Sequence, residues 1–75
     1  MVMRTMDLLR VGEEGVVAEV LCGAEEKRRL LDLGMIRGTR VCALFKSPYG
    51  EPTAYLVRGA VVALRRGDCK NIILE

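Results

Sequence analysis

Three cysteines are the residues best suited to metal or redox chemistry in this chain, which contains no histidine. A zinc or iron site built within one chain would therefore need thiolates and carboxylates as its only ligands. Cys22, Cys42 and Cys69 are scattered through the sequence and form no C-x-x-C pair, and their odd number does not fit a disulfide framework. We expect no metal site and no cofactor, and we interpret the cysteines as small apolar residues, with Cys42 half exposed.

Motifs for catalysis are also missing from the sequence. It contains neither a G-x-S-x-G nucleophile elbow nor a Walker-type G-x-x-x-x-G-K-[ST] loop. Its carboxylates fall mostly in predicted turns or in ion pairs on a helix, where they are poorly placed for acid–base catalysis. We therefore expect a protein that is not an enzyme.

The size and charge of the chain favour a small binding module. A chain of 75 residues buries only about 60% of its unfolded surface, which leaves little room for an enclosed active site. Its net charge of +2 and its three aromatic residues give weak support to nucleic-acid binding, which needs a concentrated basic face or stacking aromatics. We expect a protein partner and no nucleic acid, although a small nucleic-acid-binding module stays open as an alternative.

No apolar segment is long enough to cross a membrane, since a span needs roughly 18–20 apolar residues. The first ten residues, MVMRTMDLLR, are interrupted by Arg4, Asp7 and Arg10 and lack the apolar core of a signal peptide. We expect a cytoplasmic protein that does not itself span the membrane.

One helix is predicted to position the most unusual part of the chain, RRLLDLGMIRGTRV. It runs from about Ala24 to Leu33 and has two glutamates in its first turn, where they complement the helix dipole. Gly34 is expected to end the helix with a positive φ angle, so that Met35 packs back on Leu30. We place Leu30, Leu31 and Met35 in the core.

The remaining elements are predicted to be strands. Alternating apolar residues and glycine-containing turns indicate about five strands, joined by a hairpin turn at Arg58-Gly59 and a tight turn at Arg66-Gly67-Asp68-Cys69. In the segment TRVCALFKS, Phe45 is expected on the same face as Val41 and Ala43. Strands this short, with short links, would close to remove their edges. The predicted fold is mainly β: one domain, residues 1–75, forming a small SH3-like β-barrel of about five strands with one short inserted α-helix.

The order of these motifs resembles the FeoA family, the small cytosolic component of bacterial ferrous iron uptake. The resemblance runs from about Leu8 to Leu74 and depends on RRLLDLGMIRGTRV, followed by SPYGEP, by VRG and by ALRR. Val11 and Arg37 stand where proline is frequent in this family. The resemblance implies an SH3-like barrel that regulates or assembles FeoB, a membrane permease with a cytosolic GTP-binding domain, and so acts at the inner face of the membrane through that partner. Similar domains occur in iron-dependent repressors, and a metal-responsive regulator stays open as a second alternative.

Four residues are predicted to contact the partner. Leu33 and Ile36 lie at the end of the helix and in the turn beyond it, where exposed aliphatic side chains rimmed by cations such as Arg37 suit a docking surface. Tyr49, at the tip of the loop SPYGEPT, is a further contact for a partner or for self-association as a homo-oligomer. The alternative for the aliphatic residues is that all of them complete the core.

Overall fold

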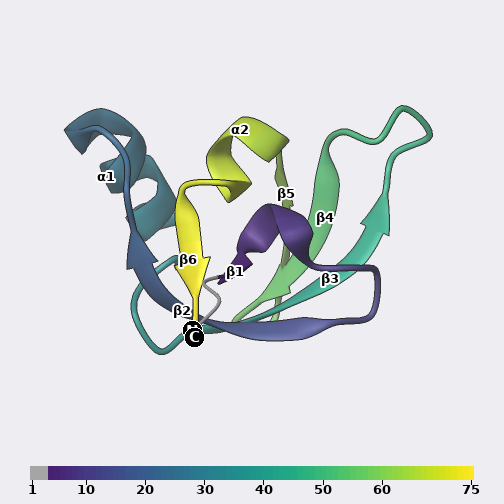
Figure 1. Cartoon of the computed structure of the whole chain (residues 1–75), viewed down its shortest axis with the longest axis horizontal. Coiled ribbons are helices and arrows are strands. Elements are labelled where there is room, and N and C mark those ends of the chain that lie inside the picture. The colour runs from purple at the N-terminus through teal and green to yellow at the C-terminus, as the bar shows by residue number, and fades with distance from the viewer. Residues whose placement is uncertain (1–3) are drawn as a thin grey trace.

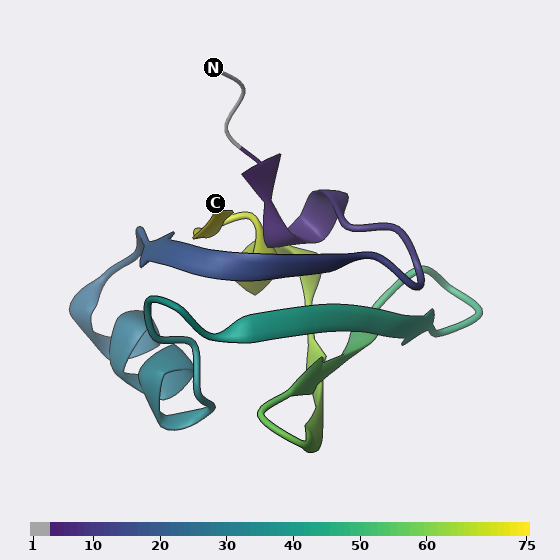
Figure 2. The same ribbon diagram turned by 90° about the horizontal axis from the view of Figure 1, so that it is seen from below.

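Six strands form one antiparallel sheet in the computed structural model, which describes residues 4–75 (Figure 1). The strands lie in the order β1-β6-β2-β3-β4-β5. In chain order their bounds are β1 Arg4–Thr5, β2 Glu14–Val20, β3 Arg40–Lys46, β4 Thr53–Val57, β5 Ala60–Leu64 and β6 Ile72–Leu74. The molecule measures 30 × 29 × 22 Å, and the sheet curls around a single core (Figure 2). The prediction of a mainly β fold with one short inserted α-helix is confirmed.

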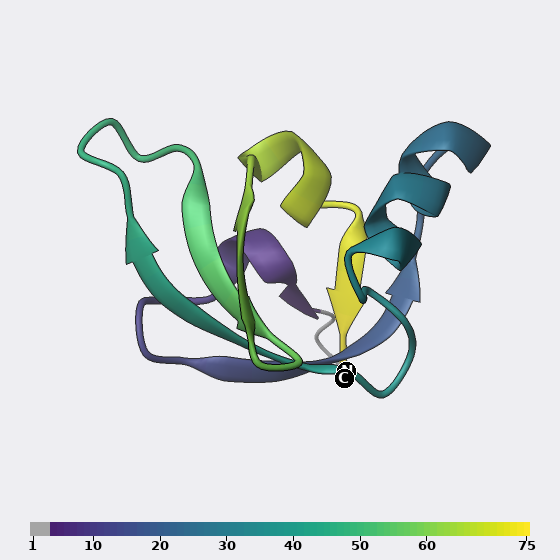
Figure 3. The same cartoon turned by 180° about the vertical axis from the view of Figure 1, so that it is seen from behind.

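Three short helical segments lie between the strands. They are the 3-10 helix η1 Met6–Leu8, the α-helix α1 Ala24–Asp32 and the single helical turn α2 Arg66–Cys69. Figure 3 shows α1 at one end of the molecule and the loop between β3 and β4 at the other. The predicted domain began at residue 1, and residues 1–3 lie outside the described part of the chain. In residues 4–75, no helix is long and apolar enough to cross a membrane.

The strand count differs from the prediction because of β1. This strand contains only two residues, and it pairs with β6 through Arg4–Leu74 and Thr5–Ile73. Two residues are too few to display an alternating pattern, so the pairing cannot be seen in the sequence.

Residues 66–69 form a helical turn rather than the tight turn that we predicted. The N–H groups of Cys69 and Lys70 donate to the carbonyls four residues earlier, Arg65 and Arg66, at 3.1 and 3.0 Å. The additional half-turn brings the side chain of Cys69 into the core, where it is only 1% exposed. Burial of this side chain and the two i→i−4 hydrogen bonds both stabilise the helical turn.

A β-bulge changes the exposure of the end of β3. Val41 and Ala43 are fully buried as predicted, but the register against β4 shifts between Ala43 and Phe45. An extra residue in one strand reverses the alternation beyond it. Phe45 is consequently 60% exposed, and the prediction that it shares the buried face is wrong.

The helix end is built as the sequence predicted. Gly34 has a φ angle of 100°, the Gly34 N–H donates to the Leu31 carbonyl at 3.0 Å, and the Met35 N–H donates to the Leu30 carbonyl at 2.9 Å. These are the two hydrogen bonds of a Schellman motif. Leu30 and Met35 are both fully buried. Leu31, which we also placed in the core, is 41% exposed, and that prediction is wrong.

Candidate functional site

A groove between α1 and β2 is the best candidate for a functional site. β3 pairs with β2 only from Glu14 to Val16, and the segment of residues 35–39 then covers Val17, whose carbonyl accepts a hydrogen bond from the Gly38 N–H at 2.7 Å. Beyond that point, β2 and α1 form the walls of the groove. Its lining residues are Val17, Ala18, Glu19, Val20, Lys27, Leu31, Met35, Ile36 and Arg37.

The groove has an apolar floor and an aliphatic rim. Val17 and Met35 are fully buried and form the floor, while Leu31 and Ile36 are each 41% exposed on the rim. The groove encloses about 200 Å³. This volume is below the roughly 300–1,000 Å³ of pockets that bind small molecules. It is better suited to one or two apolar side chains of a protein partner.

The charges around the groove are mainly positive. Lys27 and Arg37 line it and are exposed, and Glu19 is the acidic residue among its lining side chains. Arg29, on the same helix, is engaged elsewhere, because its guanidinium forms an ion pair with Asp68 of α2 at 2.6 Å. A partner that inserts apolar side chains here would therefore meet cations at the edge of the groove.

The turn that carries Ile36 and Arg37 is fixed by backbone geometry. The Thr39 N–H donates to the Ile36 carbonyl at 3.0 Å, and Gly38, in the third position of the turn, has a φ angle of 91°. A positive φ angle at that position is what a type II turn requires. The turn therefore holds Ile36 and Arg37 at the mouth of the groove without needing contacts from their own side chains.

The four predicted contact residues do not form one surface. Ile36 and Arg37 lie together in the groove, whereas Leu33 caps the helix outside it and is 37% exposed. Tyr49 is 95% exposed in the loop between β3 and β4, at the other end of the molecule from α1 (Figures 1 and 3). Tyr49 and the groove therefore cannot contact the same small segment of a partner.

Sequence reasoning missed Leu31 as a member of this surface. Its spacing from Lys27 could have indicated its exposure. Residues four apart share one face of a helix, and a lysine is rarely buried, so Leu31 is expected on an exposed face. Only Leu30, which packs beneath the Schellman turn with Met35, is buried among the residues of α1.

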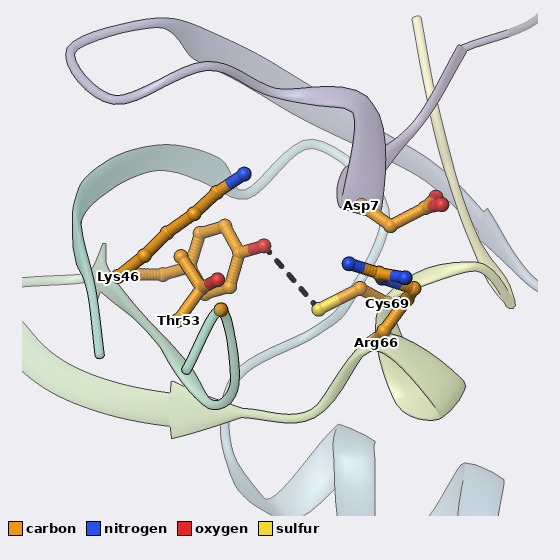
Figure 4. Close-up of a pocket in the computed structure, with 7 residues that line it drawn as sticks. Asp7, Lys46, Thr53, Arg66 and Cys69 are labelled. Atoms are coloured by element: carbon orange, nitrogen blue, oxygen red, sulfur yellow. Dashed lines mark hydrogen bonds between the residues drawn. The ribbon is translucent and has the colours of Figure 1, made fainter. Parts of the chain in front are cut away.

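A second, polar pocket lies beside α2, and the side chains that line it include Asp7, Lys46, Thr53, Arg66 and Cys69 (Figure 4). The thiol of Cys69 donates to the hydroxyl oxygen of Tyr55 at 3.4 Å, and the Tyr55 hydroxyl donates to the Met6 carbonyl at 3.4 Å. Burial raises the pKa of the Cys69 thiol to about 11, and burial also raises the pKa of Tyr55. Both groups are protonated at neutral pH, so this network holds α2, β4 and η1 together rather than supplying a nucleophile.

The cysteines do not form a ligand set. Cys22 lies between β2 and α1, Cys42 lies on β3 and Cys69 lies in α2, and all three are free thiols. Within residues 4–75 there is no group of three or more cysteine or acidic side chains that could hold a metal ion. Cys22 and Cys42 are half-buried.

Comparison with protein families gives one match, to the FeoA domain, over residues 4–75. A search of curated proteins gives no match. The family match includes the whole groove and both ends of the sheet.

Solved structures include FeoA proteins that are similar to this chain. The FeoA protein of Chlorobium tepidum is 28% identical over 96% of this chain and 69% of its own length, with a TM-score of 0.88. The FeoA-like protein of Clostridium acetobutylicum is 25% identical over 100% of this chain and 87% of its own, with a TM-score of 0.90. Stenotrophomonas maltophilia FeoA complexed with zinc, described as a prokaryotic SH3 domain protein, is 30% identical over 96% and 89%, with a TM-score of 0.84. The predicted SH3-like fold is confirmed.

Proposed function

The chain belongs to the FeoA family, which is associated with ferrous iron transport, and from this membership we propose that it is an accessory protein of iron uptake that binds the cytosolic part of a FeoB-type permease. In this proposal the protein works in the cytoplasm, at the inner face of the membrane, and it regulates or assembles the permease by protein–protein contact. GTP hydrolysis and the passage of ferrous iron belong to the permease.

The groove between α1 and β2 is the observation that carries the proposal. It combines exposed Leu31 and Ile36 with a buried apolar floor, an arrangement that suits the insertion of an apolar side chain from a partner. Its small volume favours insertion of one or two apolar side chains from a partner. Contacts of this kind, in the centre of an interface, supply most of its binding energy.

The cations at the groove predict the chemistry of the permease surface. Lys27 and Arg37 would face carboxylates that surround an apolar anchor. Exposed charges of this kind mainly speed and orient the encounter and contribute less to affinity. The association rate should therefore fall with salt more steeply than the dissociation rate rises.

The test is a binding measurement with the cytosolic domain of a FeoB-type permease from the same genome, with and without GTP. The variants are Leu31→Gln and Ile36→Gln, alone and together. Leu8→Gln is the matched control, because Leu8 is 63% exposed on η1 and does not line the groove.

The expected effect follows from the exposed fraction of each side chain. Complete burial of a leucine or isoleucine is worth about 1.5–3 kcal/mol, so covering the exposed 41% contributes about 0.6–1.2 kcal/mol per residue. The double variant should bind roughly 8- to 60-fold more weakly. Unchanged affinity of the double variant, with its folding verified by circular dichroism, would overturn the groove as the docking site.

Metal binding is the alternative raised by the zinc in Stenotrophomonas maltophilia FeoA. The donors in residues 4–75 of this chain do not fit a zinc site, since they form no group of three and Cys69 is buried with a raised thiol pKa. Transcriptional repressors provide no further support. A manganese-dependent repressor is similar at 19% identity, over 96% of this chain and 40% of its own, and this likeness shows the fold alone.

A further inference from the structure

The outer edge of β5 has the features of a strand-docking site. β5 lies at one end of the sheet and, among residues 4–75, pairs only with β4, through five regular residue pairs from Thr53–Leu64 to Val57–Ala60. Among the described residues, no backbone hydrogen bond outside that ladder involves residues 60–64. One row of backbone groups along β5 therefore has no backbone partner within residues 4–75.

Hairpin geometry identifies the open groups. The two-residue turn Arg58-Gly59, with φ angles of 52° and 84°, makes the flanking pair Val57–Ala60 the first hydrogen-bonded pair of the ladder. Because hydrogen bonding alternates along an antiparallel pair, Val61 and Ala63 direct their N–H and C=O groups away from β4. These groups are available to an added strand.

This edge lacks the features with which proteins normally prevent edge pairing. Such features are charged residues, proline, bulges or a very short strand. β1, at the other end of the sheet, contains only two residues. β5 contains five residues, all apolar, and its pairing with β4 has no bulge. Its side chain Val61 is 63% exposed and lies beside Leu56, which is also exposed.

The charges at the two ends of β5 indicate what can dock there. Arg58 lies before the strand, and Arg65 and Arg66 follow it; all three are exposed. Antiparallel pairing of β5 with β5 of a second copy would bring the end of one strand that carries Arg58 towards the end of the other that carries Arg65 and Arg66. Like charges brought close together repel, which disfavours this pairing.

The acidic residue near this edge does not remove the repulsion. The carboxylate of Glu51 accepts a hydrogen bond from the Arg66 backbone N–H at 2.7 Å and reduces the positive charge at that end. Two arginines against one glutamate still leave a positive end, and Arg58 leaves a positive charge at the other. The edge is therefore complementary to an apolar strand with carboxylates on both sides.

We propose that β5 accepts, by strand addition, an extended segment of another protein in which apolar residues alternate and acidic residues flank them. Main-chain hydrogen bonds to Val61 and Ala63 supply the register, and the exposed face formed by Val61, Ala63 and Leu56 receives the alternate side chains. This surface is separate from the groove lined by Leu31 and Ile36, and the inference goes beyond the proposed function.

The probe for this site is a fluorescent synthetic peptide in which valine alternates with threonine and two glutamates flank each end. Matched probes carry lysines in place of the glutamates, or N-methyl groups on alternate backbone amides. Binding is measured by fluorescence anisotropy and mapped by amide chemical shifts of the ¹⁵N-labelled protein. We expect saturable binding with shifts concentrated at residues 60–64, about tenfold weaker binding with lysine flanks, and loss of binding with N-methylation.

Two variants test the role of the edge itself. Ala63→Pro removes an N–H group that points away from β4, and edge strands tolerate proline at such positions. This variant should abolish peptide binding. Val61→Glu replaces an exposed apolar contact by an anion that repels the glutamate-flanked peptide, and it should weaken binding at least tenfold, which keeps the test decisive if the proline variant does not fold. Leu31→Gln should leave peptide binding unchanged.

The contrary results are equally specific. Absence of saturable binding, shifts located outside residues 60–64, or equal affinity for glutamate- and lysine-flanked peptides would overturn the proposal. A concentration-dependent dimer of the free protein, with its contacts at residues 60–64, would also overturn it, because the edge would then be occupied by a second copy.

Discussion

The contact between the end of α1 and the β4–β5 turn can be tested with two glycines that have similar positive φ angles. Gly34 and Gly38 have φ angles of 100° and 91°. A Cβ atom at Gly34 would lie 3.3 Å from Val57 Cγ1 and 3.3 Å from Arg58 Cδ, whereas a Cβ atom at Gly38 would meet nothing within 4 Å. Gly38→Ala therefore measures the cost of the backbone conformation, and Gly34→Ala measures that cost together with the packing.

The magnitudes follow from these two contributions. A left-handed conformation costs an L-residue about 1–2 kcal/mol, and the stiffer unfolded chain of an alanine variant offsets about 0.4–1 kcal/mol of it. Gly38→Ala should thus lower the free energy of unfolding by about 1 kcal/mol. Overpacking costs about 1–3 kcal/mol, and the lower end applies because the Arg58 side chain can move, so Gly34→Ala should lose about 2 kcal/mol.

Urea unfolding followed by circular dichroism provides the assay. Both variants should keep the m-value of the wild type, since the surface exposed on unfolding is unchanged. Melting temperatures should fall by about 4–8 °C for Gly38→Ala and by about twice as much for Gly34→Ala. Equal losses for the two variants would refute the reasoning, because they would mean that the end of α1 is not held against Val57 and Arg58.

Two further predictions concern the core. Burial raises the pKa of the Cys69 thiol from 9.0 to about 11, so between these pH values the folded state keeps a proton that the unfolded chain loses. The free energy of unfolding should therefore fall as the pH rises from about 9 to about 11. Urea unfolding across that range should show a less steep fall for Cys69→Ala than for the wild type. Leu30→Ala should lower the free energy of unfolding by about 2–5 kcal/mol, and Leu31→Ala should lower it by less than half as much, because Leu30 is fully buried and Leu31 is not. Similar losses for the two variants in urea unfolding would contradict the assignment of Leu31 to the surface.

Local signals in the sequence predicted the local structure well. The Schellman motif at Gly34 and the hairpin turn at Arg58-Gly59 were predicted because one or two residues with positive φ angles determine each of them. The bulge that exposes Phe45 could not be predicted in this way. It depends on the register between β3 and β4, which only the assembled sheet determines.

The two candidate surfaces depend on long-range arrangement, and the sequence identified them only in part. The groove combines three separate segments, residues 17–20, 27–31 and 35–37. Ile36 and Arg37 could therefore be predicted as contact residues, but the sequence did not show that Leu31 lines the same groove. The open edge of β5 depends on the order of strands in the sheet. An apolar strand at the centre of a sheet would have the same sequence pattern.

The most direct test of the account is to map the permease contact on the wild-type protein. The ¹⁵N-labelled chain would be titrated with the unlabelled cytosolic domain of a FeoB-type permease from the same genome, in the presence and absence of GTP, and amide chemical shifts would be recorded. The account predicts that the largest shifts occur at Lys27, Leu31 and residues 35–37. Shifts confined to the Tyr49 loop, or no binding in either nucleotide state, would contradict the docking of the permease in the groove.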